Sequence, residues 1–382
     1  MNKLLVISHT GHQTTKSGEV VGWGPTINEL NFLARHWDEV VHIACMEDCP
    51  PKGSSLPYQQ PNIRFVAIPT FGGKKISQKV NVIWKAPVIL RTVQKELYGV
   101  DAVQLRLPMG IGIFLLPFFA IKRKRPYIFW VKYANNWGAA SPPPGYRLQR
   151  WILKQNLARC KVTINGFWPN QQLHCLSFEN PCLHEEDVAN YLLVAQAKIH
   201  KPPFRLVFIG RLETEKGINE LLDALDDHNT YLELIDHIDF VGAGSLENKI
   251  KERLTSKVSF TLHGFLPKEK VFKVLGTAHF LVLPSYSEGF PKVIAEAAAF
   301  GVIPVVSDVG SIPHYIRTRE NGFIWTFRGD TSFAAVLQQA LVTKPEKLSR
   351  IKNTLLPLVA QFTFERYATR IKKEILNPRT ND

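Results

Sequence analysis

Short apolar runs alternate along the chain with longer stretches in which apolar residues recur at helical spacing. In the first of these stretches, Ile27, Leu30 and Leu33 fall on one face of a helix. The apolar runs of the first half predict strands at 3–8, 39–44, 63–68, 102–106 and 127–131. Alternating strands and helices are typical of a mostly parallel sheet with helices on both faces.

The pattern starts again after Lys201-Pro202-Pro203, where the prolines prevent helix continuation and stiffen the connection. The apolar runs of the second half predict strands at 205–209, 237–241, 258–265, 279–284 and 302–306. We therefore predict an α/β protein with two domains, each built on a mostly parallel sheet, at residues 1–195 and 204–360, followed by a helical segment at 361–382. The polar segment 9–26, which contains several glycines, is expected to be a loop.

The composition is that of a soluble globular protein, with 45% hydrophobic and 21% charged residues among 382. The formal net charge of +14 favours polyanions, anionic lipid head groups or phosphorylated substrates as partners. The basic run 122–125 follows the apolar stretch 107–121. It predicts either an electrostatic anchor to acidic lipid or cations that complement the dipole of a helix C-terminus. The sequence contains no nucleic-acid-binding module, so nucleic acid is not expected as a partner.

Two apolar segments bear on where the protein is located. The stretch 107–121 is too short, and too interrupted by proline and glycine, to span a bilayer, and the N-terminus resembles a strand more than a secretory signal. We expect a cytoplasmic protein and leave attachment to the inner face of the membrane open.

The five cysteines fit free thiols of a reducing compartment. Because the His and Cys spacings at 42–49 and 174–184 match no zinc template, no metal site is predicted.

The first strand of the second half leads directly into a loop with two cations, at residues 210–217 (GRLETEKG). Gly210 permits a sharp turn, Arg211 can bind two phosphate oxygens, and Lys216 adds a second positive charge. Together they predict a diphosphate site at a helix N-terminus. The alternative is that both cations pair with Glu213 and Glu215 on a solvated turn.

A later strand leads into a loop with a carboxylate and then into an alanine-rich helix, within residues 284–306 (PSYSEGFPKVIAEAAAFGVIPVV). Glu288 lies in the loop and Glu296 lies about two turns into the helix. Such acids can cap a helix N-terminus, but they are also good acceptors from sugar hydroxyls. Acids that can bind sugar hydroxyls, next to cations that can bind a diphosphate, indicate a nucleotide-sugar site at the carboxyl edge of the sheet.

These motifs resemble those of the GT-B glycosyltransferases, in particular the retaining glycosyltransferase family 4, or group 1. The resemblance rests on Gly210-Arg211 with Lys216-Gly217, on the glycine turn 242–244, and on Glu288 and Glu296 with seven residues between them. It extends through 305–316 and covers about 205–325. It implies two Rossmann-like domains facing each other across a cleft, with the last helix crossing back to the N-terminal domain.

The resemblance also implies roles for single residues. Arg211 and Lys216 would hold the donor diphosphate, and Glu296 would bind the ribose. The donor sugar would contact Glu288, the catalytic residue, together with Gly289 and Phe290. In the N-terminal domain, a loop containing Gly22 and Gly24 would lie near the donor.

The reaction implied by the resemblance is transfer with retention from a nucleotide-diphosphate sugar, most simply a UDP-sugar, without cofactor or metal. The sequence contains no Asp-x-Asp pair suited to Mg²⁺. The acceptor would be a saccharide or a lipid-linked saccharide, as in cell-surface polysaccharide or glycoconjugate synthesis. The alternative is a GT-B enzyme that is not a transferase, such as a UDP-sugar 2-epimerase.

Two positions depart from the family pattern. Where relatives often carry a His or Asp after a mid-chain strand, this chain has Asn135-Asn136-Trp137, which would either line the acceptor side or form a structural loop. Ser311 replaces a common second glycine, which is a mild change.

Overall fold

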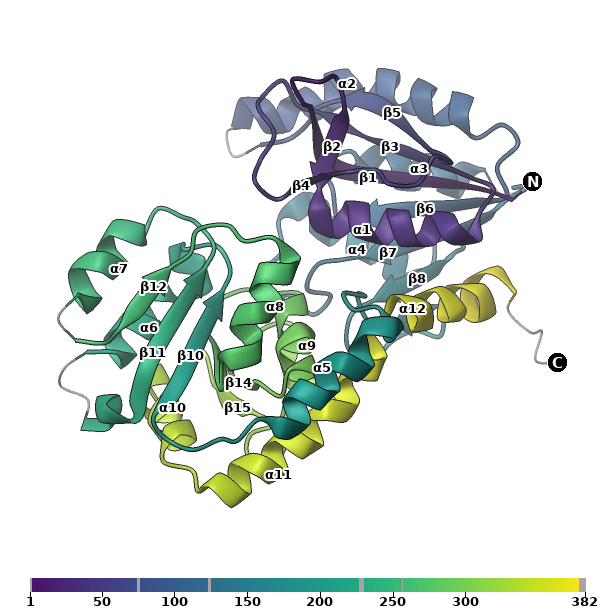
Figure 1. Cartoon of the computed structure of the whole chain (residues 1–382). Coiled ribbons are helices and arrows are strands. Elements are labelled where there is room, and N and C mark those ends of the chain that lie inside the picture. Colours follow the sequence, from purple (N-terminus) through teal and green to yellow (C-terminus); the bar gives the residue numbers. More distant parts are fainter. Residues whose placement is uncertain (1, 74–75, 123–124, 227–229, 256, 378–382) are drawn as a thin grey trace. The chain divides into compact units, whose positions relative to one another are not determined.

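The computed structural model describes residues 2–73, 76–122, 125–226, 230–255 and 257–377. The chain forms two compact units (Figure 1). The first unit contains Met1–Glu179 together with Tyr367–Asp382, and the second contains Asn180–Arg366. The chain therefore passes between the units twice.

A nine-stranded sheet forms the centre of the first unit. Its parallel strands follow the order β5-β3-β1-β6-β7-β8-β9, so that strands are added first on one side of β1 and then on the other. This is the order of a doubly wound Rossmann-like sheet. The strands are β1 Lys3–Thr14, β2 Val20–Trp23, β3 Glu39–Met46, β4 Ser55–Pro57, β5 Ile63–Pro69, β6 Ala102–Leu107, β7 Ile128–Tyr133, β8 Lys161–Ile164 and β9 Cys175–Ser177.

The segment predicted as a polar loop at 9–26 is instead a β-hairpin followed by a helix, so that prediction is wrong. Strand β1 continues to Thr14 and pairs with β2 in antiparallel register, His12 opposite Gly22. The prediction failed because polar side chains here are buried and hydrogen-bonded within the unit. His12, for example, is fully buried between the Thr10 carbonyl and the Tyr58 hydroxyl.

Helices cover both faces of this sheet (Figure 1). Alternate residues of β1 divide between two cores: Leu4 and Val6 pack with α1, while Leu5 and Ile7 pack with α2, α3 and α4. A sheet that is buried on both faces explains the continuous apolar strands in the sequence. The helices are α1 Gly24–Leu33, α2 Ile76–Glu96, α3 Gly112–Ile121 and α4 Pro144–Lys154, with a short 3₁₀ turn at Ala34–His36.

The C-terminal segment completes the core on the α1 face of the first unit. Helix α12, Phe364–Arg370, continues into a π-helical turn, Ile371–Leu376. Tyr367, Ile371 and Ile375 are buried in the same cluster as Leu4 and Val6. The Tyr367 hydroxyl also donates a 3.0 Å hydrogen bond to Glu29. Residues 367–377 are therefore an integral part of the first unit.

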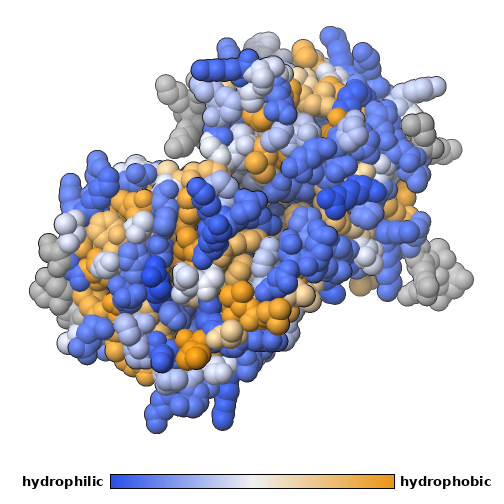
Figure 2. Space-filling model, in the orientation of Figure 1, coloured by the Kyte–Doolittle hydropathy of each residue, from blue (hydrophilic) through white to orange (hydrophobic). Residues whose placement is uncertain are grey.

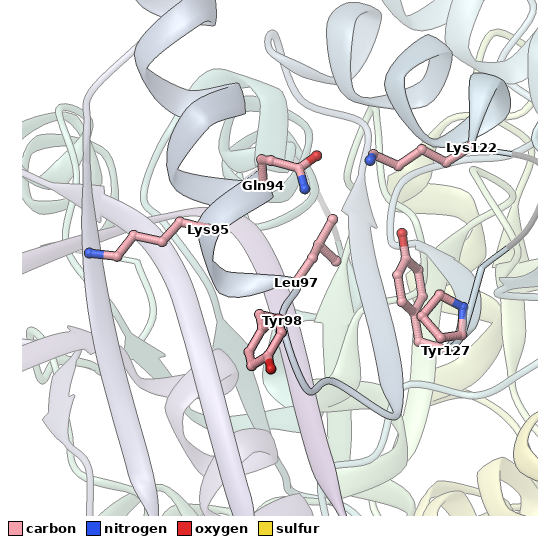
Figure 3. A pocket seen from close by; sticks show the side chains of 7 residues that line it. Gln94, Lys95, Leu97, Tyr98, Lys122 and Tyr127 are labelled. Atoms are coloured by element: carbon pink, nitrogen blue, oxygen red, sulfur yellow. The ribbon is translucent and has the colours of Figure 1, made fainter.

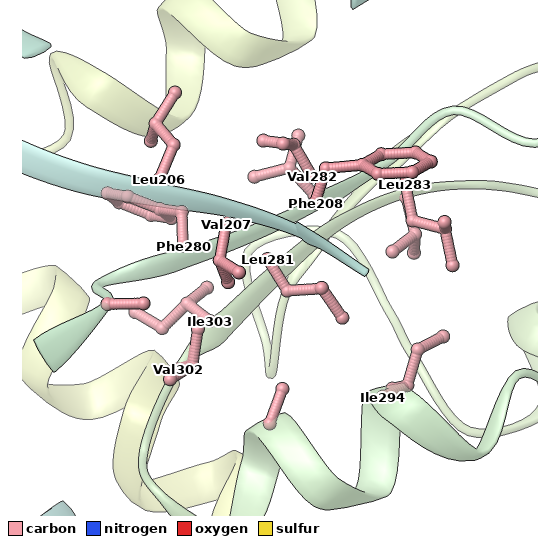
Figure 4. Packing of buried hydrophobic residues seen from close by; sticks show 14 of the residues in the cluster. Leu206, Val207, Phe208, Phe280, Leu281, Val282, Leu283, Ile294, Val302 and Ile303 are labelled. Atoms are coloured by element: carbon pink, nitrogen blue, oxygen red, sulfur yellow. The ribbon is translucent and has the colours of Figure 1, made fainter. Parts of the chain in front are cut away.

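The second unit has a six-stranded parallel sheet in the order β12-β11-β10-β13-β14-β15, again the Rossmann-like order. Figure 4 shows side chains of β10, β13 and α9, such as Phe208, Leu281 and Ile294, packed around this sheet. The strands are β10 Phe204–Ile209, β11 Ile235–Val241, β12 Phe260–Leu262, β13 Phe280–Leu283, β14 Ile303–Ser307 and β15 Phe323–Trp325. The helices are α5 Glu185–Ala197, α6 Ile218–Ala224, α7 Glu247–Leu254, α8 Lys268–Thr277, α9 Lys292–Ala299, α10 Phe333–Leu341 and α11 Pro345–Leu355, with 3₁₀ turns at Thr214–Lys216, Thr230–Leu234, Ile312–His314 and Leu356–Phe362.

Helix α5 belongs to the second unit, although it precedes the proline pair that marks the expected junction. The Lys352 ammonium in α11 donates hydrogen bonds to the carbonyls of Ala195, Gln196 and Lys198, at 2.9, 3.3 and 3.1 Å. These bonds fix the end of α5 to α11. The first unit therefore ends at Glu179, upstream of the expected boundary at 195.

The apolar stretch before the basic run forms helix α3 in the first unit. Lys122 follows it directly, while Arg123 and Lys124 lie outside the described residues. Within the described ranges, no helix combines the length and apolarity needed to cross a bilayer. On the face drawn in Figure 2, hydrophilic residues predominate and hydrophobic residues are exposed in patches.

Candidate functional site

The candidate site lies at the carboxyl edge of the second unit's sheet. Strand β10 is flanked by β11, the next strand in sequence, and by β13, which is added later on the other side. The chain leaves β10 toward β11 and leaves β13 toward β14, in opposite directions along the sheet. Doubly wound sheets bind their ligands at such a switch point. The loops that follow β10 and β13 carry the predicted cations and the first predicted acid.

Lys216 and Glu288 lie in contact at this edge. The Lys216 Nζ is 2.5 Å from Glu288 Oε1, and the two side chains are only 19% and 11% exposed. The two residues are 72 positions apart in sequence and come from the two loops on either side of the switch point. A mostly buried ammonium and carboxylate side by side offer opposite charges to a ligand bound there.

Backbone contacts hold the two loops together. Gly217 has a φ of +75°, and a Cβ there would lie 1.9 Å from the Pro284 carbonyl oxygen. The Tyr286 N–H donates a 3.0 Å hydrogen bond to the Glu215 carbonyl, and the Tyr286 hydroxyl bonds to Glu220. The close approach of Lys216 to Glu288 therefore depends on a glycine that permits backbone contact.

Arg211 forms one of the ion pairs that the alternative interpretation predicted within its own loop. It is 66% exposed and its guanidinium lies 2.8 Å from Glu215, whereas Lys216 pairs with neither Glu213 nor Glu215. The Glu213 carboxylate instead accepts hydrogen bonds from the N–H and hydroxyl of Ser245, at 3.0 and 2.6 Å. An exposed pair such as Arg211–Glu215 contributes little to stability, so Arg211 can exchange this partner for a phosphate at low cost.

Gly289 and Phe290 occupy the loop after Glu288 but play different parts. The Gly289 carbonyl accepts hydrogen bonds from the Ser311 N–H and hydroxyl, at 2.8 and 2.9 Å. The Phe290 ring is buried and stacks on Phe362 with centroids 4.8 Å apart. Only the backbone of Phe290 is therefore available for a contact with a donor sugar. Ser311, at a position where glycine is common, holds the Gly289 carbonyl through its hydroxyl as well as its N–H.

Glu296 has different neighbours from Glu288. It lies one turn into α9, where burial raises the pKa of its carboxyl while Lys268 and Lys292 act in the opposite direction. Among the residues that the structure describes, none donates a hydrogen bond to this carboxylate. Its oxygens are therefore available as acceptors, which suits the predicted contact with hydroxyls. The structure brings Lys216 and Glu288 together but records no contact between Glu288 and Glu296.

Ser285 and Tyr286 belong to this edge and were not singled out from the sequence. Ser285 is completely buried at the end of β13, and its hydroxyl has no hydrogen-bond partner among the described residues. Tyr286 stacks on Phe327 at 4.9 Å. Their only signal in the sequence is that they follow Pro284 at the end of a strand.

In the first unit, packing explains the glycines that were assigned to a loop near the donor. A Cβ at Gly22, in β2, would lie 2.4 Å from His12 Nε2, and a Cβ at Gly24 would lie 2.8 Å from the Ser54 carbonyl oxygen. Gly24 begins helix α1 and donates its N–H to that carbonyl. Proximity of these glycines to a donor stays a prediction.

The loop after β7 is mainly structural. Trp137 is buried against Tyr133, with ring centroids 4.9 Å apart, and its carbonyl accepts a 2.6 Å hydrogen bond from Arg150. Asn135 and Asn136 satisfy neighbouring backbone N–H groups at positions 136 and 138. These bonds favour the structural interpretation of this segment.

A separate hollow of about 420 Å³ lies in the first unit beside the amino ends of β6 and β7. Figure 3 shows its lining, which includes Leu97, Tyr98, Lys122 and Tyr127. Ligands of doubly wound sheets bind at the opposite, carboxyl edge, so this hollow is not part of the candidate site.

Both units thus have the Rossmann-like topology, and solved structures share the fold over nearly the whole chain. Sucrose-phosphate synthase from Thermosynechococcus elongatus superposes with a TM-score of 0.67 at 16% identity, over 97% of this chain and 98% of that one. Anabaena HepE, solved in complex with UDP, superposes with a TM-score of 0.62 at 16% identity, over 97% and 98%. The predicted fold class, two Rossmann-like domains of the GT-B type, is confirmed.

Sequence comparison matches only part of the chain. Residues 193–354 match the family described as glycosyl transferases group 1, and this segment contains Arg211, Lys216, Glu288 and Glu296. The putative teichuronic acid biosynthesis glycosyltransferase TuaC of Bacillus subtilis is 39% identical over 106 residues, which are 28% of this chain and 25% of TuaC. The amylovoran biosynthesis glycosyltransferase AmsK of Erwinia amylovora is 27% identical over 147 residues, 35% of each chain. The aligned segments span well under half of these relatives.

Proposed function

We propose that this chain is a retaining glycosyltransferase of family 4 that uses a nucleotide-diphosphate sugar and needs no metal. The observation that carries this proposal is the Lys216–Glu288 pair at the switch point of the second sheet. Lys216, with Arg211 nearby in the same loop, supplies positive charge for a diphosphate, and Glu288 supplies negative charge for the sugar. The family match over 193–354 supports this assignment.

The proposed reaction breaks the bond between the anomeric carbon and the diphosphate oxygen. Negative charge then develops on the leaving phosphate, where Lys216 and Arg211 stabilise it, and positive charge develops on the anomeric carbon, where Glu288 does. The acceptor hydroxyl attacks from the same face, and its proton passes to the departing phosphate. Glu296, with acceptor oxygens free, is assigned to the ribose hydroxyls.

The proposed donor is a UDP-sugar, because related folds were solved with UDP or UDP-2-fluoro glucose. The proposed acceptor is a saccharide or a lipid-linked saccharide in polysaccharide synthesis. Support for the acceptor comes from relatives named for teichuronic acid, amylovoran and colanic acid biosynthesis.

Calorimetric titration with UDP, GDP, ADP and dTDP tests the donor site. We expect tight binding of UDP, weakened in Lys216→Ala and Arg211→Ala and unchanged in Lys249→Ala, a control at an exposed lysine of α7 in the same unit. Equal affinity in all four proteins would place the nucleotide elsewhere. Release of a free altered sugar without acceptor would favour a 2-epimerase, and loss of turnover in EDTA would contradict metal independence.

A further inference from the structure

Charge is divided unequally between the two units. The first unit contains 26 Lys and Arg against 11 Asp and Glu, whereas the second contains 21 against 22. The net charge of +14 therefore resides in the first unit, at +15, against −1 in the second. Residues 102–178 contain 11 Lys and Arg and no acid at all. The net charge of the first unit therefore favours the binding of a large anionic partner there.

Exposed apolar side chains gather in this same acid-free part of the chain. A hollow of about 720 Å³ lies between the ends of α3 and α4, and Ile121, Trp151 and Leu157 line it. These three side chains are 79%, 53% and 48% exposed. Leu148, one turn before Trp151 on α4, is 46% exposed. Large apolar groups clustered around one hollow indicate a contact surface, in contrast to single exposed residues.

One cation lines this hollow, and two more lie on helix α4. Arg159 lines it, and Arg147 and Lys154 are exposed on α4, four residues before and three residues after Trp151. Residues at these spacings share a helix face with Trp151. The opposite face of α4 is fixed, because Gln149 is buried and exchanges hydrogen bonds with the backbone of Met109.

We propose that the α3–α4 surface, centred on Trp151, docks the protein onto an anionic phospholipid bilayer. Trp151, Ile121 and Leu157 would enter the boundary between head groups and acyl chains, where Trp is favoured, while Arg147, Lys154 and Arg159 contact lipid phosphates. The aliphatic side chains distinguish this surface from a polynucleotide site, which stacks bases on aromatic rings. The inference goes beyond the proposed function, because it uses no residue of the nucleotide-sugar site.

Co-sedimentation of the full chain with vesicles tests the proposal. We expect binding to vesicles of equal parts phosphatidylcholine and phosphatidylglycerol, weak binding to phosphatidylcholine alone, and partial release at high salt. Lys154→Ala with Arg159→Ala should weaken binding about thirtyfold. Trp151→Ser should reduce binding that survives at high salt. The matched controls are Lys344→Ala with Lys347→Ala, exposed cations of the second unit, and Trp84→Ser, at a 78% exposed position of α2.

Several outcomes would overturn the proposal. Binding that is equal on neutral and anionic vesicles would remove the charge argument, and a loss in Trp84→Ser without a loss in Trp151→Ser would move the surface to α2. Tighter binding to single-stranded RNA than to vesicles would favour a polynucleotide. UDP affinity, measured on each variant in solution, should be unchanged, so that a failure here is separate from a failure of the proposed transferase activity.

Discussion

The Lys216 ammonium lies 2.5 Å from the Glu288 carboxylate and joins the loop after β10 to the loop after β13. In the absence of a donor, each charge is the other's partner. A diphosphate that approaches Lys216 therefore competes with Glu288, and this competition gives the two residues opposite effects on nucleotide affinity.

Substitution of these two residues should separate binding from turnover. Lys216→Ala should weaken UDP binding about tenfold to a hundredfold, because it removes a charge-assisted hydrogen bond worth about 1.5–3 kcal/mol. Glu288→Gln should bind UDP at least as tightly as the natural chain, because a competing anion is gone, while kcat falls. Calorimetry and sugar-transfer assays measure the two effects. Equal weakening of UDP binding by both variants would contradict this assignment.

The glycine between these loops should tolerate no side chain. Gly217→Ala is expected to destabilise the protein by several kcal/mol, because its φ is +75° and its Cβ would meet the Pro284 carbonyl oxygen at 1.9 Å. Gly276→Ala, in helix α8, is the matched control: its Cβ meets no atom within 4 Å, so a gain of about 0.5–1 kcal/mol is expected. Urea unfolding measures both changes, and similar losses in the two variants would show that the close contact is absent.

A buried charge cluster should dominate the stability of the first unit. Glu29 is 4% exposed, accepts from Lys132 at 2.7 Å and from Arg106 at 3.0 Å, and also bonds Tyr367. Glu29→Ala leaves two buried cations without their anion and should cost about 3–5 kcal/mol in the free energy of unfolding. Lys52→Ala, which breaks an exposed pair with Glu47, should cost less than about 1 kcal/mol. A small loss for Glu29→Ala in urea unfolding would contradict the burial of this cluster.

The stability of the second unit should fall on acidification through His200. Burial, with His279 and Lys198 nearby, lowers the pKa of His200 from 6.5 to about 3, and its Nδ1 is buried with no partner among the described residues. The unfolded chain therefore binds a proton between pH 6.5 and 3 that the folded chain does not, and the free energy of unfolding falls by about 1.4 kcal/mol per pH unit in this window. His200→Gln should remove this contribution, and His36→Gln, at an exposed position, is the control. Unfolding by urea at pH 7 and pH 5 gives the slopes; the same slope in His200→Gln and the natural chain would reject the assignment.

Much of the second unit was predictable because its strands are apolar runs buried on both faces of a parallel sheet. The runs at 205–209 and 279–284 coincide closely with β10 and β13, and the loops after them were placed at one edge. The partner of each charged residue was not predictable in the same way. Lys216 had nearby acids in its own loop, yet it pairs with Glu288, 72 residues away, because the strand order makes their loops neighbours.

In the first unit, prediction from the sequence failed where polar residues are buried. The hairpin of β1 and β2 contains His12, whose burial depends on partners at Tyr58 and Thr10 and on the space left by Gly22. The Tyr58 partner comes from a distant segment, and polarity alone predicts exposure. The acid-free stretch 102–178 was visible in the sequence, but which of its apolar side chains are exposed depends on how α3 and α4 pack.

The last segment has a consequence for synthesis of the chain on the ribosome. Tyr367, Ile371 and Ile375 belong to the same core as Leu4 and Val6, although translation separates them by the whole of the second unit. The first unit therefore acquires these buried side chains only after the whole of the second unit has been synthesised. Until then, the part of the α1 face that Tyr367, Ile371 and Ile375 cover is exposed, and a chaperone would be expected to bind there during elongation.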